Sequence, residues 1–198
     1  MAISPRYDLD RMNDCGTSDL PIPTMPPKQL AQFSGAQDFR VLVADEQQLL
    51  AIDEQQIIRA VRLVLADSPF KRAEVSVAVV DDSAIHALNA EFLSHDYPTD
   101  VLSFVLEESA VALEGELVVS SETALREAAE AVWAPGDELL LYVIHGALHL
   151  VGYDDQNLEA RRRMLAAELA TLSQLGVTLP ADQSRWRAIP KPSEENSQ

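Results

Sequence analysis

The apolar positions between residues 37 and 179 alternate between short runs and helical spacing, which predicts strands and helices in mixed order. Short apolar or β-branched runs predict four strands, at residues 39–44, 74–80, 101–106 and 116–120. Apolar residues at helical spacing predict helices within residues 53–68, 83–92, 123–132, 137–150 and 158–175. We therefore expect one domain of four strands and four or five helices.

Polar residues and glycines mark the expected element boundaries. Helix N-termini are predicted where a side-chain oxygen can accept a backbone N–H, namely at Asp53, at Ser120 or Ser121, and at Asp137. The pair at residues 135–136, Pro-Gly, is expected to break the preceding helix. Gly152 is expected to end the helix over 137–150, and Gly115 marks a turn or a close approach between the last two strands.

Both ends of the chain differ from this folded part. Residues 1–36 contain five prolines without sustained periodicity, and we expect a disordered N-terminal arm; residues 180–198 are expected to form a disordered C-terminal tail. This leaves residues 37–179 as the domain. Cys15 is the only cysteine and cannot form an internal disulfide, which fits a reducing compartment. No segment has the length of a membrane span, so the expected location is cytoplasmic.

The formal charge of −17 belongs to the domain, since residues 37–179 hold 9 Lys and Arg against 25 Asp and Glu. Broad nucleic-acid binding depends on neutralising phosphates with basic residues, so this balance argues against it, and no DNA partner is expected. A local basic groove stays compatible with the composition.

The helix predicted over residues 137–150 is apolar nearly all the way round except for two histidines. His145 and His149 are four residues apart, so both imidazoles project from one face and can reach one metal ion. A third ligand has to come from outside this turn, and either Asp154 or Asp155 supplies a carboxylate. Alternatively, both histidines are hydrogen-bonded core residues. Burying the pair without partners is costly, which favours the metal.

Three segments in order resemble one known family. HGALHLVGYDD at residues 145–155 agrees with the pattern H-G-x-L-H-L-x-G-Y-D-H at ten of eleven positions. LNAEFLSHDYPTDVLSF at residues 88–104 resembles L-N-x-x-Y-R-x-x-D-x-P-T-D-V-L-S-F, and GELVVS at residues 115–120 resembles G-D-I-V-I-S. These patterns are those of the YbeY family of bacterial rRNA-maturation endoribonucleases, which the chain resembles over roughly residues 38–175.

The resemblance implies an α+β fold: a mixed four-stranded sheet with one antiparallel strand, packed with about five helices in a zincin-like arrangement. It also implies one Zn²⁺ ion per chain, held by His145, His149 and Asp155. Asp155 departs from the family, which usually has histidine there. A two-histidine, one-carboxylate set is a known zinc arrangement. The added negative charge is expected to make the zinc a weaker Lewis acid and to relax the preference for zinc over manganese.

A second departure concerns the residue that would act on the RNA. Leu93 follows Phe92 where the family has arginine, and leucine cannot donate to a phosphate. His95 is expected to be an ordinary exposed loop histidine. No catalytic base is assigned, since Asp154 is at least as readily a loop cap or a partner of a ligand as a proton acceptor.

Contacts to RNA have to come from few basic residues. Three sets are available: Arg59 and Arg62 on the first predicted helix, Lys71 and Arg72 before the second strand, and residues 161–163, all arginine, on the last helix. Each set is more often a solvated face, and Arg59 and Arg62 are the candidates for a substrate-binding groove. A single positive stripe on an acidic molecule favours one shaped RNA and repels others.

Three functions are compatible with these features. The first, implied by the resemblance, is a zinc-dependent, single-strand-specific endoribonuclease of 16S rRNA 3′-end maturation and 70S ribosome quality control, with ribosomal RNA and the small subunit as partners. The second is a ribosome-assembly binding factor with reduced or lost nuclease activity, motivated by Leu93 and Asp155. The third is a metal-dependent hydrolase of another substrate, such as a peptide. Gly146 weighs against it, because the glutamate of a protease H-E-x-x-H motif is missing.

Overall fold

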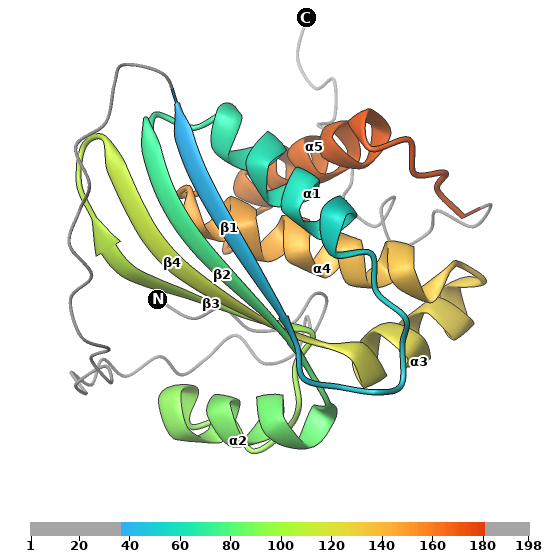
Figure 1. The fold of residues 1–198 in the computed structure, drawn as a ribbon. Helices are drawn as coiled ribbons and strands as arrows, with labels where there is room; N and C mark the ends of the chain where they lie inside the picture. Colours follow the sequence, from blue (N-terminus) through green and yellow to red (C-terminus); the bar gives the residue numbers. More distant parts are fainter. Residues whose placement is uncertain (1–36, 181–198) are drawn as a thin grey trace, which may run out of the picture.

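The computed structural model describes residues 37–180 (Figure 1). Its elements are β1 (Asp38–Asp45), α1 (Glu54–Ala66), β2 (Arg72–Val80), α2 (Asp82–Leu93), β3 (Val101–Glu108), β4 (Ala112–Ser120), α3 (Ser121–Ala131), α4 (Pro135–Leu150) and α5 (Leu158–Gln174). Each predicted strand and helix is present, although β4 begins at Ala112 and not at residue 116. The expected arm over residues 1–36, with Cys15, and residues 181–198 of the expected tail lie outside the described part.

The four strands form one mixed sheet in the order β1-β2-β4-β3. β2 pairs in parallel with both β1 and β4, while β3 pairs with β4 in antiparallel orientation. Parallel neighbours need a crossover connection, which α1 supplies between β1 and β2. β3 and β4 are joined directly by the short turn at residues 109–111. The predicted α+β fold, with its single antiparallel strand and five helices, is confirmed.

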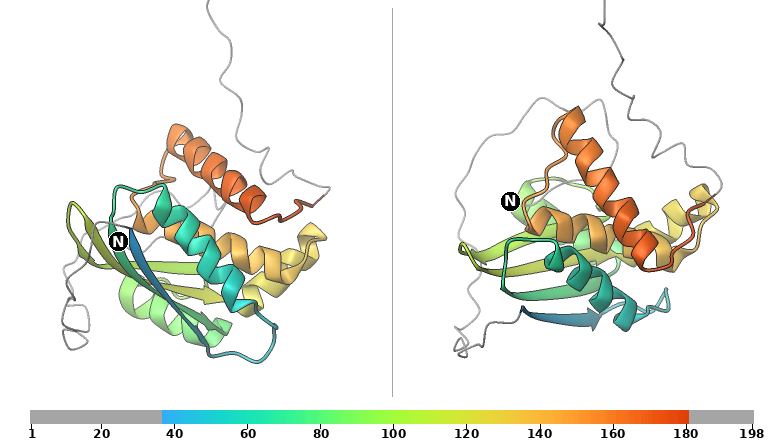
Figure 2. Two further views of the ribbon diagram at one scale, coloured as in Figure 1. Left: turned by 45° about the horizontal axis from the view of Figure 1, so that its top comes forward. Right: turned by 90° about the horizontal axis from the view of Figure 1, so that it is seen from above.

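The helices cover the two faces of this sheet unequally (Figure 1 and Figure 2). On one face α1, α4 and α5 pack together over the strands, and on the other lies α2. Alternation along β4 shows the same division: Leu117 and Val119 belong to the large core shared with α4, while Val118 joins a smaller cluster with Ile85 of α2.

The centre of the large core is α4, in which every residue from Glu138 to Leu150 is buried. Gly146 lets this helix lie close to the sheet, because a Cβ there would be 2.8 Å from Cγ2 of Val101 and 3.0 Å from Cδ2 of Leu117. The hydroxyl of Ser103 donates to the Gly146 carbonyl at 3.2 Å. Although α4 is largely apolar, neither it nor any other helix within residues 37–180 is long and apolar enough to cross a membrane.

Two predicted caps and one predicted close approach are confirmed. Asp53 accepts the N–H of Gln56 at the start of α1. Ser120 accepts the N–H of Thr123 at the start of α3. Gly115 lies inside β4, where a Cβ would come within 3.0 Å of both δ-carbons of Leu150. This glycine therefore marks a close approach of α4 to the sheet and not a turn.

The predicted start of α4 is wrong. Pro135 is the first residue of α4 and does not act as a breaker, because α3 has already ended at Val132, which adopts φ 53°. The N-cap of α4 is Ala134, which makes no side-chain capping bond, and Asp137 lies in the first turn of the helix. Proline suits this position because the N–H it lacks would have no partner in the first turn of a helix.

Candidate metal centre

The end of α4 turns the chain so that the following residues fold back beside the helix. Gly152 adopts φ 91°, a conformation that glycine tolerates without cost to a side chain. Its N–H donates to the carbonyl of His149 at 3.0 Å, and the N–H of Tyr153 donates to the carbonyl of Leu148 at 2.9 Å. These two bonds form the Schellman ending that Gly152 predicts. As a result, residues 153–155 lie next to the last turn of α4.

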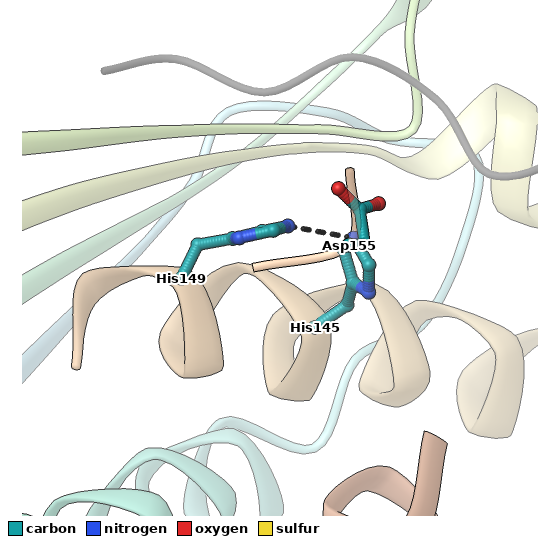
Figure 3. A group of neighbouring side chains, drawn as sticks. All are labelled: His145, His149 and Asp155. Atoms are coloured by element: carbon teal, nitrogen blue, oxygen red, sulfur yellow. Dashed lines mark hydrogen bonds between the residues drawn. The ribbon is translucent and has the colours of Figure 1, made fainter. Parts of the chain in front are cut away.

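Three side chains converge at this place (Figure 3). One ligand atom each from His145, His149 and Asp155 lies within 4.8 Å of the other two. Both histidines are buried and Asp155 is half-buried. The two Nε2 atoms are 3.0 Å apart. Two nitrogens bound to one tetrahedral zinc at about 2.0–2.1 Å would be about 3.3 Å apart, so the observed spacing is close to what one ion requires.

Hydrogen bonds at the outer ring nitrogens assign the protons of both histidines. Nδ1 of His145 lies 2.7 Å from Oε1 of Glu168, and Nδ1 of His149 lies 3.0 Å from the main-chain carbonyl of Tyr153. Because a carboxylate and a carbonyl only accept, each Nδ1 carries the proton and donates it. A neutral imidazole then has no proton on Nε2. The two Nε2 atoms face each other 3.0 Å apart, a spacing at which they share one hydrogen bond or bind one cation between them.

The electrostatics of the site keep His149 uncharged. Burial and, to a smaller extent, the neighbouring His145 lower the pKa of its imidazole to about 4. The Tyr153 carbonyl and the carboxylates of Asp155 and Glu168 raise this pKa without offsetting the burial. His149 is therefore neutral at neutral pH, as ligation of a metal requires.

Glu168 is the site residue that the sequence analysis misses. Its side chain is 3% exposed and holds the ring of His145 from α5. A carboxylate behind a histidine fixes the orientation and tautomer of the ring, as is common around bound metals. A local signal does exist: Glu168 lies on the buried face of α5, four residues from each of two buried apolar residues, Met164 and Leu172. An acidic residue on an apolar face indicates a buried polar partner.

The two aspartates that the sequence leaves as alternatives have different surroundings. Oδ1 of Asp154 accepts the N–H groups of Asp155 at 2.8 Å and Gln156 at 3.1 Å, which makes Asp154 a cap of the loop. The carboxylate of Asp155 joins the two histidines. Nε of Arg161 donates to the main-chain carbonyl of Asp155 at 2.7 Å, so this arginine holds the loop and is not simply part of a solvated face.

The other candidate residues lie outside the cluster of three donors. Arg59 and Arg62 are exposed on α1, and their contact with RNA stays a prediction. Leu93 packs against the smaller hydrophobic cluster beneath α2. His95 is half-buried and not exposed: its ring stacks on Tyr97 with centroids 5.3 Å apart, and its Nδ1 is buried without a hydrogen-bond partner among the described residues.

Fold and site together define an α+β protein with a cluster of three side chains, beside a buried helix, that could hold a metal ion. Residues 42–176 match the protein family described as Endoribonuclease YbeY. A relative of that name from Rhodopirellula baltica is 51% identical over 111 residues, covering 55% of this chain and 57% of the relative. Another from Pelotomaculum thermopropionicum is 38% identical over 149 residues, covering 70% of this chain and 98% of the relative.

The chain also aligns with solved structures. The solution structure of TM1509 from Thermotoga maritima aligns with a TM-score of 0.48 and 24% identity, covering 80% of this chain and 99% of the other. Because the family match extends over residues 42–176, the chain belongs to the YbeY family of endoribonucleases, hydrolases that cleave RNA phosphodiester bonds. The resemblance of the three sequence segments is thereby confirmed. The alignment with the Rhodopirellula relative spans little more than half of that protein.

Proposed function

We propose that this protein is a zinc-dependent endoribonuclease, specific for single-stranded RNA, that acts in 16S rRNA 3′-end maturation and 70S ribosome quality control in the cytoplasm. The pair of Nε2 atoms 3.0 Å apart, next to the carboxylate of Asp155, carries the metal part of this proposal. Membership of the family supports RNA as the substrate. Ribosomal RNA and the small ribosomal subunit are the proposed partners, and residues 37–179 the proposed catalytic domain.

His145, His149 and Asp155 would hold one zinc ion. The chemistry that zinc supplies when bound is Lewis-acid stabilisation of negative charge developing on a phosphodiester, together with activation of water. Hydrogen bonds hold both imidazoles in place: Glu168 orients His145, and the Tyr153 carbonyl orients His149. We expect a lower Lewis acidity than in a site of three histidines, because Asp155 adds a negative charge.

Arg59 and Arg62 are proposed to contact the RNA backbone. Both are exposed on α1, and α1 packs beside α4, which carries the two histidines. Guanidinium groups suit this role because they donate to phosphate in a fixed fork.

Two measurements on the full chain test the proposal. The first is the metal content of purified wild type, Asp155→Ala and Asp155→His. One zinc per chain in the wild type, lost or weakened with alanine and retained with histidine, is expected. The second is cleavage of a single-stranded RNA that carries the 16S 3′ end. Cleavage should stop with a chelator and with His149→Ala. Cleavage that survives His149→Ala in pure protein would contradict the proposal.

A second candidate is a ribosome-assembly factor with reduced or lost nuclease activity. Its specific support is Leu93, whose side chain packs against the cluster of Val80, Ile85, Leu102 and Val118 and supplies no cation for a phosphate. Small-subunit association that is equal in wild type and His149→Ala, with no cleavage by either, would favour this candidate.

A further inference from the structure

A cleft of about 510 Å³ adjoins the loop that carries Asp155. Residues 151–154 form one wall, and four residues of α5 form the other: Ala160, Arg163, Ala166 and Ala167. Ala160, Arg163 and Ala167 are three and four positions apart and therefore lie along one stripe of the helix, with Ala166 beside it. Three alanines leave this wall flat and apolar, with one guanidinium group as its only charged side chain.

Tyr153 brings an aromatic ring to the loop wall of the cleft. The residue is 38% exposed, although the neighbouring His149 is buried. Its main-chain carbonyl accepts the Nδ1 proton of His149, so its backbone is fixed relative to the metal donors. Tyr153 thus combines an exposed aromatic residue at the cleft with a backbone carbonyl bonded to one of the metal donors.

Arg163 brings a positive charge to the opposite wall. It pairs with Glu159 at 3.7 Å, and the two side chains are 63% and 67% exposed. Ion pairs this exposed contribute little, so a phosphate can compete for the guanidinium. Asp154 also lines the cleft, and the N–H groups of Asp155 and Gln156 bind its Oδ1. Those two donors offset part of the negative charge that would repel a phosphate.

We propose that this cleft binds one nucleotide of single-stranded RNA, with its base stacked on Tyr153 and a phosphate at Arg163. This inference rests on the proposed function and deepens it by naming a substrate subsite. Every base has a face for stacking, whereas a paired base in a duplex does not expose it, so the subsite favours unpaired RNA of any sequence. Tyr153 and Asp155 are two residues apart, with Cα atoms at most about 7.6 Å apart. A base on Tyr153 therefore places the adjoining backbone beside the metal donors.

RNA binding by the full chain without metal tests this subsite. The probe is a fluorescein-labelled single-stranded oligoribonucleotide followed by fluorescence anisotropy in a chelator, so that cleavage does not interfere. Tyr153→Leu should weaken binding about fivefold or more, and Tyr153→Phe should bind as the wild type does, because it keeps the ring. Arg163→Gln should weaken binding and reduce the slope of log affinity against log salt by about 0.7, the value for one phosphate on a single strand.

A matched control uses another exposed arginine. Arg40 on β1 pairs with Glu74 at 3.4 Å and is 56% exposed, so Arg40→Gln removes the same charge from a similar surface pair. This variant should keep the wild-type affinity and salt slope.

The outcomes separate this inference from the proposed function. If Tyr153→Leu and Arg163→Gln bind RNA as tightly as the wild type does, the subsite is overturned and the nuclease proposal stays intact. A wild type that neither binds nor cleaves RNA would overturn both.

Discussion

Replacing Glu168 by glutamine tests whether this buried carboxylate sets the metal affinity of the site. Oε1 of Glu168 accepts the Nδ1 proton of His145 at 2.7 Å, and the two side chains are 3% and 6% exposed. Glutamine has nearly the same shape and keeps a carbonyl oxygen as an acceptor. The variant therefore removes the negative charge behind His145 without opening a cavity.

The expected loss of zinc affinity follows from the strength of the hydrogen bond between Glu168 and His145. A hydrogen bond to a charged group contributes about 1.5–3 kcal/mol. At about 1.4 kcal/mol per tenfold change, its complete loss corresponds to zinc binding weakened about 10- to 100-fold. The range measured for outer partners of metal-bound histidines is the same, about 10- to 100-fold. We expect about tenfold for Glu168→Gln, because the amide oxygen still accepts the proton.

Zinc affinity would be measured by competition with a chromophoric chelator at fixed pH. Glu159→Gln provides the control, since Glu159 lies on the same helix and is 67% exposed; it should leave the affinity unchanged. Urea unfolding of both metal-free variants checks that the fold is retained. If folded Glu168→Gln binds zinc within twofold of the wild type, the carboxylate does not tune the site, and the reasoning fails.

Three further predictions concern packing, pH and the loop. Gly146→Ala should lower the free energy of unfolding by about 1–3 kcal/mol in urea titrations, because its Cβ would lie 2.8 Å from Val101; unchanged stability would show that α4 can shift from β3. Burial raises the pKa of Asp82, but hydrogen bonds from two hydroxyls and Arg126 lower it below 3.8 overall. The ionised carboxylate thus stabilises the fold above pH 3.8, and this contribution is lost as the pH falls below that value; urea midpoints of Asp82→Asn should depend less on pH there. Zinc titration of Asp154→Asn should match the wild type, because asparagine keeps the capping oxygen, while Asp154→Ala should bind more weakly; equal losses in both would indicate that Asp154 is itself a ligand.

Local sequence patterns determine the helices and strands and place two of the three candidate metal donors. Capping and helical spacing act over three or four residues, and for this reason Asp53, Ser120 and Gly152 predict the ends of their helices correctly. The same geometry places His145 and His149 on one face of α4 before any tertiary contact is known. Local rules fail where one residue type serves two purposes: Pro135 can break a helix or begin one, and it begins α4.

Only the tertiary structure decides what surrounds the two histidines. Glu168 lies 23 residues from His145 along the chain and reaches it because α5 packs against α4. The distinction between Asp154 and Asp155 depends on the hydrogen bonds that turn the loop after α4, including the one from Arg161. Periodicity specifies the face of a helix on which a side chain lies. The packing of distant elements determines which group that face meets, and residue spacing along the chain carries no record of it.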